Sequence, residues 1–166
     1  MAIAFVDTML KETDATFLIV DRRPKVGGHW NDAYPFVRLH QPSSFYGVAS
    51  RPLGRHKLDE TGFNKGHFEL ATGVEVTHYY HALMEEVFIP SKRVQYLPLC
   101  DYTEDGGIVS LMSGEVHKVT VNLKVVNATH MTTDIPMTHT PNFKIAEGVK
   151  CVPPNNLCQL APEYKH

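Results

Sequence analysis

Apolar residues recur at helical spacing in the first segment of the chain. Ile3, Val6 and Leu10 are three and four positions apart, and Asp7 falls on the opposite side. This pattern predicts an amphipathic helix over residues 2–12. The predicted helix begins directly after the first methionine, without a capping residue before it.

A continuous apolar run follows this helix. Residues 16–20 read Thr-Phe-Leu-Ile-Val, and Asp21 ends the run. Such a run is typical of a strand that is buried on both faces of a parallel sheet. A helix that leads into a parallel strand implies an earlier strand on the other side of the helix, and the sequence contains none. We therefore expect a parallel sheet that lacks its first strand.

Residues 31–73 are rich in proline, glycine, serine and aromatic residues and show little periodicity. A segment of this length without regular structure is more typical of a functional, wrapping loop than of a linker. Helical spacing returns over residues 74–89, where Val76, Tyr80 and Leu83 share a face. Pro90 is expected to end this helix.

The second half of the chain contains short β patterns. Strands are predicted over residues 94–99, 108–112 and 116–123, with Ser-Gly-Glu at 113–115 as the tight turn between the last two. Residues 125–129, Val-Val-Asn-Ala-Thr, read as another buried strand. The chain then becomes proline-rich, and no closing element is predicted.

Together these elements predict an α/β fold. Residues 1–166 are expected to form one incomplete domain, a partial Rossmann-like layer with a small antiparallel β insertion at about 94–123. The hydrophobic content of 43% and charged content of 20% are those of an ordinary globular protein.

Composition also narrows the classes of partner. The net charge of −2 and the absence of a long basic run argue against a nucleic-acid partner. No stretch approaches the roughly 18 apolar residues of a membrane span. The N-terminus lacks the basic region of a signal peptide, and three cysteines without a Cys-x-x-Cys pair are typical of reduced thiols. We expect a cytoplasmic protein with neither nucleic-acid nor membrane partners.

An acid, a basic stretch and a double glycine follow the buried strand. In dinucleotide-binding βαβ units, an acid at the end of the second strand accepts hydrogen bonds from an adenosine ribose, about 20 residues beyond the glycine loop. Asp21 occupies that position if the glycine loop would lie just before Met1. Gly27 and Gly28 by themselves are typical of a plain turn.

Three segments resemble a known family. Residues 17–30, FLIVDRRPKVGGHW, resemble the second strand and following loop of flavin-containing and Baeyer–Villiger-type monooxygenases, where an acid and a basic stretch precede Gly-Gly-x-Trp. Residues 34–47, YPFVRLHQPSSFYG, are similar to the family's next block, which runs beneath the flavin. Residues 125–129 resemble a strand that ends in Ala-Thr-Gly. The likeness extends over nearly the whole chain and is greatest to bacterial and fungal FAD/NAD(P)-binding oxidoreductases.

The resemblance implies an FAD-binding domain and assigns cofactor-binding residues. Asp21 would bind the adenosine ribose of FAD, and Arg22 would lie along the adenosine. Gly27 and Gly28 would let the backbone pass close to the cofactor, because a residue without Cβ permits that approach at little cost. The residues implied near the isoalloxazine ring are Trp30, His40 and Gln41. Arg22 and Arg23 could instead contact the 2′-phosphate of NADP, but an acid at the strand end repels that group.

The sequence also departs from the family. The family begins with Gly-x-Gly-x-x-Gly, which holds the FAD pyrophosphate, and continues into a second glycine-rich unit for NADPH or NADH. Neither motif is present, and His130 stands where the family has the glycine of Ala-Thr-Gly. The resemblance therefore implies a fragment of an FAD-dependent, NAD(P)H-linked oxidoreductase, monooxygenase-like, with a small-molecule substrate and weak or no activity alone. The flavin carries the chemistry in this family, so no catalytic side chain is assigned.

Two other functions stay open. The main alternative is a non-enzymatic remnant or interaction module without a cofactor. A His-based metal hydrolase is a weaker one, because His78 and His81 are three positions apart on a predicted helix but no Glu-x-x-His accompanies them. Ser43 and Ser44 near His40 suggest a nucleophile and base, yet the strained Gly-x-Ser-x-Gly turn is missing, which favours ordinary polar loop residues.

Overall fold

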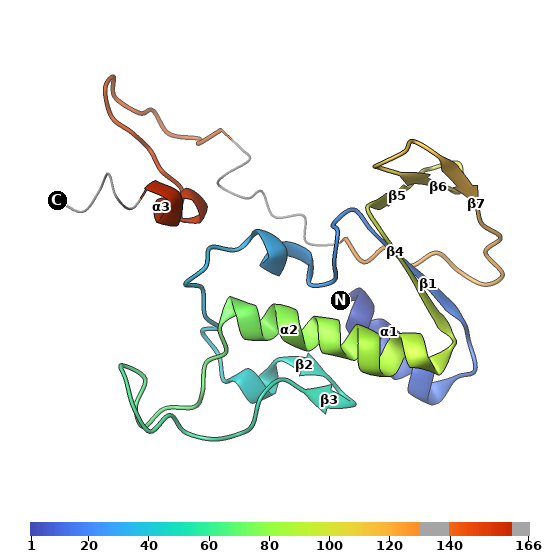
Figure 1. Ribbon diagram of the computed structural model, residues 1–166, viewed down its shortest axis with the longest axis horizontal. Helices are drawn as coiled ribbons and strands as arrows, with labels where there is room; N and C mark the ends of the chain where they lie inside the picture. The colour runs from blue at the N-terminus through green and yellow to red at the C-terminus, as the bar shows by residue number, and fades with distance from the viewer. Residues whose placement is uncertain (130–139, 161–166) are drawn as a thin grey trace.

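The computed structural model describes residues 1–129 and 140–160 and combines helices with short strands (Figure 1). The α-helices are α1 (Ala2–Glu12), α2 (Gly73–Leu83) and α3 (Pro154–Leu160). The strands are β1 (Phe17–Asp21), β2 (Gly47–Val48), β3 (Arg51–Pro52), β4 (Val94–Pro98), β5 (Cys100–Tyr102), β6 (Gly107–Ser110) and β7 (Val116–Lys118). Single turns of other helix types are η1 (Gly28–Asp32), η2 (Ser43–Phe45), η3 (Met84–Phe88) and η4 (Ile89–Ser91).

A parallel pair of strands forms the α/β part of the fold. β1 pairs with β4 in register, from Phe17 opposite Val94 to Asp21 opposite Pro98. The helix over residues 2–12 and the strand that follows it are confirmed. The assignment of residues 94–99 to an antiparallel insertion is wrong, because the long connection through α2 returns the chain parallel to β1.

Within the described ranges, β1 has no strand partner at the edge opposite β4. Among the described residues, β1 has β4 as its partner and the sheet contains two strands. Every residue of β1 is only partly buried, although its apolar run predicted burial on both faces. The predicted strand over residues 125–129 is wrong, because these residues form no strand, and Val125 and Val126 are 54% and 52% exposed.

Two antiparallel sheets complete the β structure. β5, β6 and β7 form a three-stranded sheet, and β2 pairs with β3 in a hairpin that the sequence did not indicate. Residues 113–115 lie in the connection between β6 and β7, as predicted. The two strands are shorter than expected, since β6 ends at Ser110 and β7 ends at Lys118.

The helix α2 begins at a capping box and ends in an irregular turn. The Thr72 hydroxyl accepts a hydrogen bond from the Glu75 backbone N–H, and the Glu75 carboxylate accepts one from the Thr72 N–H, which is a capping box. The predicted single helix over residues 74–89 is only partly right. The α-helix ends at Leu83, and the chain continues through the π-helical turn η3 and the 3₁₀ turn η4, which contains Pro90.

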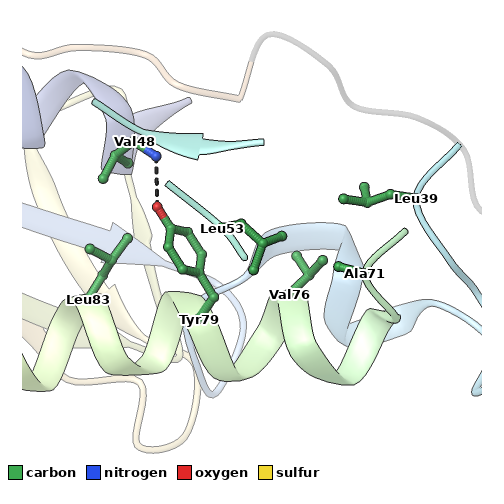
Figure 2. Close-up of a cluster of buried hydrophobic side chains, with 7 residues drawn as sticks. All are labelled: Leu39, Val48, Leu53, Ala71, Val76, Tyr79 and Leu83. Carbon is green, nitrogen blue, oxygen red and sulfur yellow. Dashed lines mark hydrogen bonds between the residues drawn. The ribbon is translucent and has the colours of Figure 1, made fainter. Parts of the chain in front are cut away.

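Most of the buried apolar side chains fall into two groups that meet along this helix. Cluster 1, between α2 and the β2–β3 hairpin, contains Leu39, Val48, Leu53, Ala71, Val76, Tyr79 and Leu83 (Figure 2). Cluster 2, between α1, η3 and the parallel pair, contains Val6, Val26, Met84, Phe88 and Val94. α2 and η3 therefore join the parallel pair to the hairpin.

Polar contacts fix α1 and α3 to the rest of the fold. The Arg93 guanidinium donates to the carbonyl oxygens of Leu10 and Thr13 at the C-terminal end of α1, where free carbonyls favour a cation. The buried Asp7 carboxylate accepts hydrogen bonds from the Ser50 N–H and hydroxyl. Contrary to the sequence expectation, a short helix, α3, follows the proline-rich segment, and its Asn155 donates to the Asp32 carbonyl.

Candidate functional site

Asp21 lies where the sequence placed it, at the carboxyl end of β1. Its side chain is partly buried, and Oδ1 accepts a hydrogen bond from the Arg23 backbone N–H at 3.0 Å. The neighbouring Arg22 side chain is 72% exposed, with Nε 3.5 Å from Oδ2 of Asp101. An exposed ion pair of this kind holds its partners weakly. The end of β1 thus presents a fixed carboxylate beside a guanidinium that can move.

The loop after β1 is held in one conformation by two side chains. Nε of Arg23 lies 2.7 Å from Oδ2 of Asp32 and donates to it. Nδ2 of Asn31 lies 3.2 Å, 3.2 Å and 3.1 Å from the carbonyl oxygens of Lys25, Val26 and Gly28. Sequence reasoning missed these contacts, since they join residues of a loop that has no periodicity to reveal a partner.

Both glycines of the loop have a backbone conformation that L-residues rarely adopt. Gly27 has φ 120° and Gly28 has φ 55°. A Cβ on Gly27 would lie 3.1 Å from Nδ2 of Asn31, whereas a Cβ on Gly28 would meet no atom within 4 Å. The backbone at Gly28 is therefore open to an approaching group, as a cofactor cradle requires. This open backbone and the Asp21 carboxylate are compatible with the sugar–phosphate portion of FAD.

Trp30 is directed into the fold rather than away from it. Its indole Nε1–H donates to the Tyr46 hydroxyl at 2.7 Å, and the two rings meet edge to face. The Tyr80 hydroxyl donates to the same Tyr46 oxygen at 3.0 Å. Trp30 therefore belongs to an aromatic network that packs against cluster 1.

His40 and Gln41 lie beside the start of α2. Leu39 donates its N–H to the Ala71 carbonyl at 2.8 Å, next to the N-cap residue Thr72. His40 is exposed and Gln41 is partly buried. The seven predicted residues thus fall into three groups: Asp21 and Arg22 at the end of β1; Gly27, Gly28 and Trp30 at η1; and His40 and Gln41 near α2. Their role in binding a cofactor stays a prediction.

A hollow of about 130 Å³ lies between η1 and the first turns of α2. Trp30, Asn31, Tyr34, Gly73 and Thr77 are among its lining residues, and Asp21 is not. Ligand pockets measure about 300–1,000 Å³, so this hollow is too small for a flavin ring. It can hold water or a small polar group.

The serines and histidines that suggested a nucleophile or a metal site do not come together in one cluster of the described residues. Oγ of Ser44 lies 2.8 Å from Nδ1 of His56, and the buried Ser43 hydroxyl donates to the Glu69 carbonyl at 2.7 Å. His78 and His81 are exposed on α2. In the described ranges, no group of three potential metal ligands comes together. No helix there has the length and apolarity needed to cross a membrane.

The tyrosines of the aromatic network predict a loss of stability in alkaline solution. Burial, followed by the hydrogen bond to Tyr46, raises the pKa of Tyr80 above its usual value. An unfolded tyrosine titrates near pH 10, so the unfolded chain loses its proton first. The contribution of Tyr80 to the free energy of unfolding is thus expected to be constant below about pH 10 and to fall above it. Urea unfolding between pH 8 and 11 measures this fall. Tyr80→Phe is expected to make this fall less steep, while Tyr79 and Tyr96, whose pKa values burial also raises, keep part of it. Tyr102→Phe, at a residue 42% exposed, is the matched control variant.

Comparison with known proteins gives relatives without an assigned function. One protein of Mycobacterium bovis and two of Mycobacterium tuberculosis strains, each named an uncharacterized protein, are 42% identical to this chain over 166 residues, 100% of its length. The chain spans 31% of the length of these relatives. No family model and no solved structure matches it.

Proposed function

We propose that this chain forms the adenosine side of an FAD site in an NAD(P)H-linked, monooxygenase-like oxidoreductase. The observation that supports the proposal best is the carboxylate of Asp21, which ends a parallel strand just before the open backbone at Gly28. Ribose hydroxyls donate hydrogen bonds to a carboxylate at this position of a βαβ unit. In this arrangement Asp21 binds the sugar, and the backbone at Gly27 and Gly28 passes close to the cofactor.

The charges around Asp21 favour FAD over a 2′-phosphorylated nucleotide. The Asp21 carboxylate repels an added phosphate on the ribose, and Arg23 is already bonded to Asp32. The exposed Arg22 is free to lie over the adenosine. When bound, FAD would supply hydride and oxygen chemistry, while the residues of this chain bind and orient it.

The length of the relatives is compatible with this proposal. They are roughly three times as long as this chain, which leaves room for further domains. Glycine-rich phosphate loops for FAD and for NADPH or NADH, together with the site for a small-molecule substrate, would belong to this additional length. We therefore expect weak FAD binding and little activity from these 166 residues by themselves.

A non-enzymatic interaction module is the second candidate. It is favoured by the small hollow beside η1 and by Trp30, whose indole N–H is already bonded to Tyr46. In this case the Arg23–Asp32 pair and the glycine turn shape a loop that contacts another protein. The two candidates differ in whether flavin is bound.

Equilibrium titration with FAD tests the proposed function, because it also detects the weak binding expected of these 166 residues. The change in visible flavin absorbance on binding is measured for the wild-type chain, for Asp21→Asn and for Asp14→Asn. Asp21→Asn is expected to weaken FAD binding about tenfold or more, because a hydrogen bond to a charged group contributes about 1.5–3 kcal/mol. Asp14→Asn, an exposed change shortly before β1, is expected to bind like the wild type.

The full-length M. tuberculosis relative provides the stringent form of this test. The full-length relative is expected to bind flavin tightly. Changing its residue aligned with Asp21 to asparagine is expected to abolish that flavin binding. If neither the relative nor this chain binds flavin, FAD binding is wrong and the interaction module is the better account. Equal affinity of Asp21→Asn and the wild type for FAD would remove Asp21 from the site.

A further inference from the structure

The chain exposes far more surface than a self-contained protein of its mass. Its solvent-accessible area is 12327 Å². A compact monomer of 18.7 kDa exposes about 8,300 Å² on the usual scaling of area with mass. The chain is therefore less compact than a self-contained domain of its mass.

Apolar side chains are concentrated on one exposed segment, residues 119–129, which we call the arm. Within six consecutive positions the arm exposes Val121 by 47%, Leu123 by 83%, Val125 by 54% and Val126 by 52%. The arm contains no helix or strand (Figure 1). An apolar segment of this kind marks an interaction site or an aggregation hazard.

The arm has the features of a strand that lacks its partner. Val119, Val121, Leu123 and Val125 alternate with other residues, the period of a strand with one apolar face. The arm ends in a defined stop, where Oδ1 of Asn127 accepts hydrogen bonds from the N–H and hydroxyl of Thr129 at 2.9 Å and 2.6 Å. A free apolar strand does not form in water without a partner to satisfy its backbone groups.

We propose that the arm is an interface covered by polypeptide that the mycobacterial relatives carry outside the matched 31% of their length. The covering segment pairs with the arm through backbone hydrogen bonds and buries its alternating apolar face. Further polypeptide of the same chain is favoured over a second copy, because the matched part is only 31% of the length of the relatives. The relatives supply roughly twice the mass of this chain for that purpose.

Hydrogen–deuterium exchange of the arm tests this interface without reference to flavin. In the 166-residue chain the amides of residues 119–129 are expected to exchange at nearly the rate of an unfolded peptide. In the full-length M. tuberculosis relative, the aligned amides are expected to exchange at least about a hundredfold more slowly, because paired strands open rarely. The amides of α2, which contains the fully buried Val76 and Leu83, provide an internal reference in both proteins.

A pair of substitutions gives a second readout. The two substitutions are Leu123→Lys in the arm and Met112→Lys in the β6–β7 turn, where Met112 is 77% exposed. Both are expected to leave the thermal midpoint of the 166-residue chain unchanged. At the aligned positions of the relative, only the change at the Leu123 position is expected to lower the midpoint and the soluble yield. Equal effects at the two positions would contradict the proposal.

The possible outcomes separate the occupants of the arm. Slow exchange in the relative and fast exchange in this chain support the proposal. Fast exchange in both overturns it. A dimer of the 166-residue chain in light scattering, with slow exchange of the arm, also overturns it, because the occupant is then a second copy. Flavin binding can fail while the arm is protected, so this result and that of the proposed function are independent.

Discussion

Gly47→Ala is expected to lower the free energy of unfolding by about 3–5 kcal/mol. Gly47 has φ 123°, which costs an L-residue about 1–3 kcal/mol. The new Cβ would lie 2.7 Å from the Tyr79 hydroxyl oxygen and 2.8 Å from the backbone nitrogen of Leu53. The backbone atom cannot rotate away, and displacing Tyr79 breaks its hydrogen bond from the Val48 N–H, 2.7 Å long (Figure 2). A buried donor without a partner costs a further 1–3 kcal/mol or so.

Gly62→Ala is the matched control for this experiment. Gly62 has φ 75°, but a Cβ there meets no atom within 4 Å. Only the conformational cost of about 1–2 kcal/mol is expected. Urea unfolding followed by the fluorescence of Trp30, the single tryptophan, measures both variants. If the two alanines cost the same, the close contacts at Gly47 contribute nothing.

The elements that the sequence predicted correctly are those with a strong local signal. The three- and four-residue spacing of Ile3, Val6 and Leu10 predicted α1, and the run that ends at Asp21 predicted β1. Partner choice was predicted poorly. The residues of β4 were assigned to an antiparallel group, because a short β pattern specifies neither the direction nor the identity of its partner.

Helical periodicity did not predict the irregular end of α2, where a π-helical turn follows Leu83. Val76 and Leu83 belong to cluster 1, whereas Met84 and Phe88 belong to cluster 2. Tyr80 and Val87 pack against both clusters, so this stretch of helix lies between two cores. Periodicity does not show where the α-helix gives way to the π-helical turn at Met84–Phe88, because such turns have no simple sequence signature.

The candidate site was predictable only in part for a similar reason. Asp21 and the two glycines lie next to a recognisable strand, so their positions follow from sequence. The hydrogen bond from Trp30 to Tyr46 joins residues 16 positions apart in a segment without periodicity. The sequence therefore did not predict that the indole lies toward the interior. The apolarity of Val125 and Val126 suggested burial, but apolarity alone does not say what covers a residue.

Truncation of Phe88 to alanine is expected to unfold a large fraction of the chain at 25 °C. Phe88 is fully buried, at 0% exposure, and packs with Val6, Val26 and Val94 in cluster 2. Removing a buried phenylalanine ring costs about 3–5 kcal/mol through lost burial and the cavity that remains. Domains are stable by about 5–15 kcal/mol in total. A chain with so much exposed surface is expected near the lower limit, which leaves little reserve.

The contrast with an exposed phenylalanine separates packing from composition. Phe63 is 85% exposed, and Phe63→Ala is expected to change the free energy of unfolding by less than about 0.5 kcal/mol. Phe88→Leu keeps most of the buried volume and is expected to lie between the two. Circular dichroism and urea unfolding of the three variants give this order directly. Because Phe88 joins α1, η3 and β4, its loss is also expected to release the parallel pair, so Phe88→Ala should increase amide exchange in β1 as well as in η3.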